Sequence, residues 1–138
     1  MPRVRDFNPE NISATFNRRI LVTHNSHPFQ GKSWLFTIFL PRWLMTERGK
    51  VEICTPEDQD LLEDMLEYHF GGLSVEPEYL KGIGKREGEM ETNLHRRIIF
   101  IASRWRGTMR YLNALRSELE ACSGEEQILI LRQELYII

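Results

Sequence analysis

The sequence is poor in cysteine, in long apolar runs and in net charge, and each shortage excludes a class of protein. Its two cysteines, Cys54 and Cys122, lie far apart and form no CxxC motif. This favours reduced thiols in the cytoplasm over a disulfide framework. No apolar run approaches the roughly 20 residues that span a bilayer, and residues 1–10 lack the apolar stretch of a signal peptide. We therefore expect a cytoplasmic protein that does not contact membranes.

Nucleic-acid, metal and cofactor binding are disfavoured by further absences. The formal net charge of −2 gives no general attraction to polyanions. The stretch 95–103, HRRIIFIAS, lacks the glycine and the paired aromatic residues of RNA-recognition motifs. Neither a P-loop nor a GxGxxG motif occurs, and His24 and His27 form an HxxH pair with no evident third ligand. We expect no nucleic acid, no metal and no cofactor.

Apolar periodicity and turn signals predict four strands and two helices after residue 32. The clearest element is a helix at 56–70, with Thr55 as N-cap, Asp58 completing a capping box and Gly71 ending it. The other predicted elements are a strand at 33–40, an edge strand at 73–80 that contains Pro77, a loop at 81–92, a strand at 93–102, a helix that follows the 103–107 junction and closes at Ser123, and a strand at 127–138.

The order of these elements, β-α-β-β-α-β, predicts a ferredoxin-like α+β sandwich. Two right-handed crossovers interleaved in this way give a four-stranded antiparallel sheet with both helices on one face. The strongly apolar strands at 33–40 and 93–102 would lie in the centre, and the strand with Pro77 at an edge. We expect residues 33–138 to form this domain and residues 1–32 to form an N-terminal extension.

The predicted sheet has apolar side chains on both faces, and two helices cover only one of them. Leaving the other face bare would cost several kcal/mol at ~25 cal/mol per Å² and would promote association. We expect a second copy of the chain to cover it, which makes a homodimer, and the segment before Ser33 is the alternative cover. The expected interface or cavity residues are Trp34, Phe36, Phe39, Ile99, Ile101 and Leu129.

The junction between the third strand and the second helix is a candidate anion site. Arg104 and Arg106, the hydroxyls of Ser103 and Thr108, and the free N–H groups of a helix start could together hold a phosphate or a carboxylate. Charge along the chain offers another interpretation. Residues 51–80 contain nine acidic residues and no Lys or Arg, so these arginines could instead pair with the first helix.

These features favour a non-catalytic module that binds a small ligand or a protein partner, acting as a homodimer. The alternative is a small cofactor-independent enzyme, of monooxygenase or isomerase type, that uses an interior cavity. The expected layout resembles that of the dimeric α+β barrel proteins, many of which use such a cavity for hydrophobic substrates. An enzyme of this kind should place a His or a carboxylate inside an otherwise apolar pocket.

Overall fold

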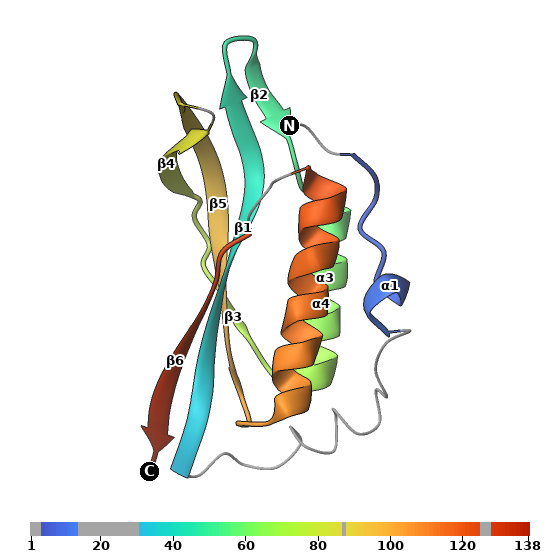
Figure 1. Cartoon of the computed structure of the whole chain (residues 1–138), viewed down its shortest axis with the longest axis vertical. Helices are drawn as coiled ribbons and strands as arrows, with labels where there is room; N and C mark the ends of the chain where they lie inside the picture. The colour runs from blue at the N-terminus through green and yellow to red at the C-terminus, as the bar shows by residue number, and fades with distance from the viewer. Residues whose placement is uncertain (1–3, 14–30, 87, 125–127) are drawn as a thin grey trace.

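The computed structural model describes residues 4–13, 31–86, 88–124 and 128–138, and it confirms the predicted α+β class (Figure 1). These ranges contain six strands and three helices. In chain order they are α1 (Glu10–Ser13), β1 (Gly31–Thr46), β2 (Gly49–Glu52), α3 (Pro56–Phe70), β3 (Ser74–Val75), β4 (Leu80–Arg86), β5 (Glu89–Ala102), α4 (Arg106–Ser123) and β6 (Ile130–Ile137).

All six strands belong to one antiparallel sheet, which curls as a half-barrel (Figure 1). The long strands β1 and β5 pair along most of their length in its centre. The other edge of β1 carries β6 along its first half and β2 along its second. The other edge of β5 carries β3 and β4. The expectation of four strands is therefore corrected to six.

Strands of the structure run through several stretches that the sequence predicts to be loops or breaks. β1 continues past Pro41 because a register shift between Pro41 and Trp43 accommodates a residue that has no N–H to donate. Residues 81–92 form most of the β4–β5 hairpin rather than a loop. Pro77 splits the predicted edge strand, so that β3 and β4 flank it. The segment 80–86, LKGIGKR, carries glycines and gives little apolar alternation, so the sequence pattern predicts a loop where most of β4 lies.

Helix α3 begins and ends as the sequence predicts, and α4 ends as predicted but begins at Arg106, inside the predicted 103–107 junction. The Thr55 hydroxyl accepts a hydrogen bond from the N–H of Asp58 at 3.1 Å, and the Asp58 carboxylate accepts one from the N–H of Thr55 at 3.3 Å, which completes the capping box at the start of α3. Gly71 and Gly124 close the two helices in the left-handed conformation. No helix within the described ranges is both long enough and apolar enough to cross a membrane.

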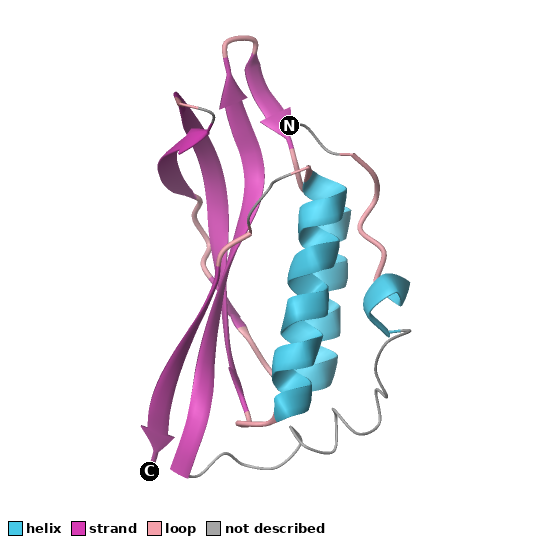
Figure 2. Cartoon of the chain, viewed as in Figure 1, coloured by secondary structure: helices cyan, strands magenta, loops and turns pink. Residues whose placement is uncertain are grey.

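The core lies between the sheet and the two long helices, which cover the same face of the sheet (Figure 2). Phe100 of β5 joins the layers, because its ring stacks on Phe36 of β1 at 5.5 Å and on Phe70 of α3 at 4.8 Å. The most deeply buried core side chains from the two layers are Phe36, Ile38, Ile98, Leu62, Leu66, Tyr111 and Leu115. The opposite face of the sheet carries no helix in the part of the chain that the structure describes.

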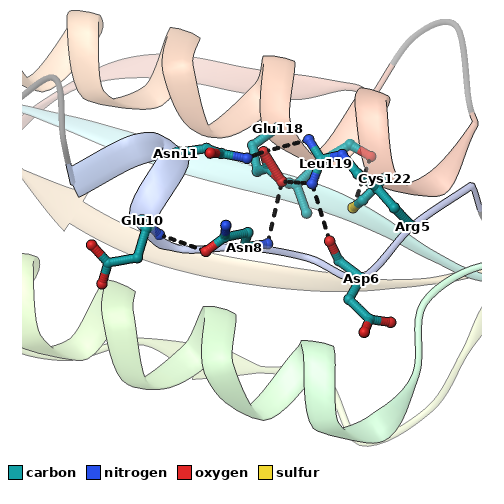
Figure 3. Close-up of polar contacts among 8 residues, drawn as sticks. All are labelled: Arg5, Asp6, Asn8, Glu10, Asn11, Glu118, Leu119 and Cys122. Carbon is teal, nitrogen blue, oxygen red and sulfur yellow. Dashed lines mark hydrogen bonds and ion pairs between the residues drawn. The ribbon is translucent and has the colours of Figure 1, made fainter.

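Residues 4–13 form a strap over α4 on the side away from the sheet (Figure 1). Phe7 and Ile12 insert into the core. The strap is fixed by Glu118, whose carboxylate accepts hydrogen bonds from both Arg5 guanidinium nitrogens at 2.6 and 2.7 Å and from the Asn11 amide at 2.7 Å (Figure 3). This part of the N-terminal extension therefore packs on the helices and does not cover the second face of the sheet. The sequence also allows a short strand at residues 20–23, which lie outside the described residues.

Candidate functional site

The face of the sheet opposite the helices, called here the uncovered face, is apolar. Side chains alternate along a strand, and directly opposed residues in antiparallel strands share a face. The pairs Leu35–Ile101 and Thr37–Ile99 therefore lie together, with Leu131 opposite Thr37 on the other side of β1. Leu131 is 45% exposed. The large apolar side chains of the uncovered face include Leu35, Phe39, Ile99, Ile101, Leu129, Leu131 and Leu135.

The structure divides the predicted interface residues between the two faces of the sheet. Phe39, Ile99, Ile101 and Leu129 belong to the uncovered face. Phe36 lies on the opposite face, where it is 1% exposed in the core. Trp34 also lies on the helix side, packed against the edge of that core. Only the first four residues are therefore placed to meet a partner or a ligand over the uncovered face.

A pocket of about 320 Å³ opens on the uncovered face. Its lining residues belong to β1, β4 and β5 and to the segment that leads into β6. Most of the lining is apolar or glycine, and the polar side chains are those of Asn93 and His95. The apolar and glycine residues of the lining are Phe39, Pro41, Gly82, Ile83, Gly84, Ile128 and Leu129.

His95 is held in a defined orientation in this pocket. Its ring packs edge-on to Phe39, with the ring centres 5.4 Å apart, and its Nδ1 lies 3.1 Å from Asn93 Oδ1. Because an amide oxygen only accepts, Nδ1 carries the proton and Nε2 is left as an acceptor. Burial, and then the nearby Arg97 guanidinium, lower the pKa of His95 below its usual 6.5, against an opposing effect of Glu76. The neutral form of the imidazole therefore predominates at pH 7.

Gly82 keeps the pocket open beside His95. A Cβ atom at this position would lie 2.7 Å from Asn93 Oδ1 and 3.1 Å from the His95 ring. Such contacts would force both polar side chains to move. Gly84, two residues along β4, also lines the pocket, but a Cβ atom there would meet nothing within 4 Å. The two glycines thus differ sharply in how closely they approach the polar side chains.

The predicted anion-binding residues lie at the junction of β5 and α4, where two of them have partners within the chain. Thr108 is completely buried, and its hydroxyl donates to the carbonyl oxygen of Ser103 at 3.2 Å. Arg104 pairs with Glu134 at 3.3 Å rather than with the acidic first helix. Arg106, at the first position of α4, is exposed. Anion binding at this junction stays a prediction.

Sequence reasoning missed His95 and the pocket around it. The usable signal was the alternation of Asn93, His95 and Arg97, which places three polar side chains on the face that also carries Ile99 and Ile101. Gly82 and Gly84 suggested a loop, whereas they line the pocket from a strand. In the described ranges, no group of three or more His, Cys, Asp or Glu residues is arranged to hold a metal ion, and His24 and His27 lie outside those ranges.

In comparisons with known proteins, no family model matches this sequence, and neither a curated protein nor a solved structure matches it.

Proposed function

We propose that this protein is a homodimeric module that binds a small, largely apolar molecule carrying a hydroxyl group, in the pocket around His95. The observation that carries the proposal is a neutral, oriented imidazole in an otherwise apolar pocket on an apolar sheet face. Small-molecule sites commonly combine an apolar lining with a few polar groups that fix the orientation of the ligand. The pairing of His95 with Asn93 has that character.

The class of ligand follows from the protonation of His95. With its proton on Nδ1, the imidazole offers Nε2 as an acceptor, which suits a hydroxyl donor. A neutral imidazole gives no charge attraction for a carboxylate. Nearby, Arg97 and Glu76 form an ion pair with each other, so little net charge faces the pocket. These features favour an uncharged phenol or alcohol over an acid.

The homodimer is supported by the uncovered face. Large apolar side chains there, including Leu129 at 46% and Leu131 at 45% exposure, form the kind of surface that marks an interaction site. Residues 4–13 pack on the helices and are not available to cover it. We also infer that the fold is an elaborated ferredoxin-like sandwich. The neighbouring positions of β6, β1, β5 and β3, and the two long helices on one face, support this inference.

A second candidate is a small cofactor-independent enzyme. The specific observation in its favour is again His95, because a neutral imidazole oriented by a hydrogen bond is what a general base needs. Incubation of the protein with the bound phenol in air, followed by mass spectrometry of the small molecule, separates the two candidates. A changed product that is lost in His95→Gln would favour the enzyme, and an unchanged ligand would favour the binding module.

The proposed site is tested with para-propylphenol as probe and propylbenzene as its match without a hydroxyl. Nuclear magnetic resonance of the His95 ring reports where each one binds. The phenol should bind about tenfold more tightly, the size of one good hydrogen bond. Its affinity should fall as the pH drops below 6.5 and through the lowered pKa of His95, because a protonated Nε2 no longer accepts.

Gly82→Ala and Gly84→Ala form a matched pair for the same test. The first should weaken phenol binding about tenfold or more, because the new methyl group displaces Asn93 and His95. The second should weaken binding much less, because its methyl group meets no side chain within 4 Å. Equal binding of phenol and propylbenzene, or equal effects of the two alanines, would remove the pocket around His95 as the site.

A further inference from the structure

The strand β6 has an edge that no other strand of the described structure occupies. It pairs with β1 from Ile130 to Ile137, and its other side has no partner among the residues described. The N–H of Phe39 donates to the carbonyl oxygen of Leu129 at 3.0 Å, so these opposed residues form a hydrogen-bonded pair. Bonding alternates along an antiparallel strand. The backbone groups of the even-numbered residues, from Ile130 to Tyr136, therefore point away from β1.

We propose that this free edge pairs antiparallel with the same edge of a second copy, with the two-fold axis at Gln133. The inference rests on the homodimer proposed above and says where its two chains join. In this register Arg132 lies opposite the partner's Glu134, and Leu131 lies opposite the partner's Leu135. Ile130 meets the partner's Tyr136. Opposite charges and apolar side chains are thus matched along the whole strand.

Charge selects this register over its neighbours. Because the outward-pointing groups belong to even-numbered residues, the allowed registers differ by steps of two residues. One step in either direction sets Arg132 against the partner's Arg132, or Glu134 against the partner's Glu134. Like charges directly opposed on paired strands are unfavourable, and opposite charges are favourable. The central register alone avoids both clashes while pairing the full strand.

The charged side chains that this register uses are available for a partner. Arg132 is exposed and lies over the Trp34 ring, 4.8 Å from its centre. The side chain of Glu134 is 65% exposed, and its contact with Arg104 is an exposed ion pair, a kind of interaction that contributes little stability. Arg132 also lies 3.7 Å from the Met109 sulfur, and exposed contacts of this kind and with an aromatic ring are weak, so both charges can turn to a second chain with little loss to the subunit.

Joining β6 strands also places the two uncovered faces side by side. Directly opposed residues of an antiparallel pair project to the same face, so Leu131 and the partner's Leu135 extend one apolar surface from one copy to the other. Two half-barrels then become one continuous sheet with all long helices on its far side. The contact therefore brings Leu131 and Leu135 of both copies together, while the rest of the joined apolar face is not covered by it.

Charge reversal tests the proposal on the full chain by sedimentation equilibrium. Arg132→Glu and Glu134→Arg should each raise the dimer dissociation constant about tenfold or more, because each creates two like-charge contacts. An equimolar mixture should recover dimers, since the hetero-pair again opposes unlike charges. Arg116→Glu, an exposed reversal on α4, is the control and should leave the dimer unchanged. Melting temperatures identify any variant that fails to fold.

The outcomes separate this inference from the proposed homodimer. If the unchanged protein is a monomer at all concentrations, the homodimer and the β6 contact are both wrong. If it is a dimer that neither reversal weakens, the homodimer stands and the β6 contact is overturned. Recovery in the mixture supports the register itself, because a general loss of stability would not be repaired by mixing.

Cysteine cross-linking checks the position of the axis without altering charge. In the proposed register the two Gln133 residues form a non-hydrogen-bonded pair, with Cα atoms about 4.5 Å apart, within the range of a disulfide. Gln133→Cys should therefore form a covalent dimer under mild oxidation. In Leu131→Cys the two thiols would sit four residues apart, roughly 14 Å, and should not link. Cys54 and Cys122 are buried. Equal linking by both variants would overturn the register.

Discussion

At the scale of single residues, Glu118 is the side chain that ties residues 4–13 to the helical layer. It is only 3% exposed, and it binds the Arg5 guanidinium, the Asn11 amide and the Asn8 backbone N–H (Figure 3). Burial alone would raise the pKa of Glu118, but the hydrogen bonds outweigh it, and the pKa lies below its ordinary 4.5. The native state therefore holds the charged form, which fastens the strap to α4.

Glu118→Gln should destabilise the protein by about 2 kcal/mol at pH 7, because it removes the charge from a buried hydrogen-bonding group. A carboxylate with a lowered native pKa contributes stability above its ordinary pKa, and this contribution is lost as the pH falls through the native value. The difference in melting temperature between the two proteins should therefore be largest at neutral pH and shrink below pH 4.5. Glu67→Gln, an exposed change on α3, should show neither effect.

The contrast between Glu118 and His95 shows what the sequence could reveal about residues. The Thr55–Asp58 cap is local, and the spacing of its two residues is enough to identify it. Glu118 binds Arg5, which lies 113 positions away in the sequence. The His95 ring packs against Phe39 of β1 and lies close to Gly82 of β4. Such contacts depend on which strands become neighbours and on the register between them, and neither follows from local spacing.

At the scale of elements, the start of α3 is secured by the Thr55–Asp58 capping box. Thr55→Ala should lower the free energy of unfolding by about 1 kcal/mol, because the N–H of Asp58 loses its acceptor. Urea denaturation measures the change. Thr55→Ser keeps the hydroxyl and should recover most of the loss. An alanine variant as stable as the unchanged protein would mean that solvent caps the helix equally well.

Helices could be predicted more accurately than strands for a physical reason. Both ends of α3 are marked by the Thr55 cap and Gly71, and the end of α4 is marked by Gly124, so each signal lies within a residue or two of the helix. The hairpin of β4 and β5 carries glycines and charged side chains, and its stability comes from pairing with a neighbour rather than from an apolar pattern. β6 was predicted from its apolar residues, yet its free edge follows only from the pairing of its other side with β1.

At the scale of the whole molecule, the subunit buries one face of its sheet and leaves the other uncovered. The helical layer, including residues 4–13, lies entirely on one side. The sequence predicted that both faces are apolar, which is confirmed by Leu35, Ile101 and Leu131. In the proposed homodimer, a second copy would remove part of this surface, around Leu131 and Leu135, from water, which would add stability. The melting temperature of the protein should therefore rise with protein concentration.

Leu131→Lys tests this expectation against a matched surface change, Leu61→Lys on α3. The two leucines are 45% and 44% exposed in the subunit, so both lysines should be tolerated equally well within one chain. Only position 131 lies on the uncovered face. Its lysine should raise the dimer dissociation constant at least about tenfold, since association would bury a charge in place of a leucine. It should also remove the concentration dependence of the melting temperature, whereas the lysine at 61 should leave both unchanged. If the lysine at 61 weakens the dimer as much as the one at 131, association involves the helical layer and not the uncovered face.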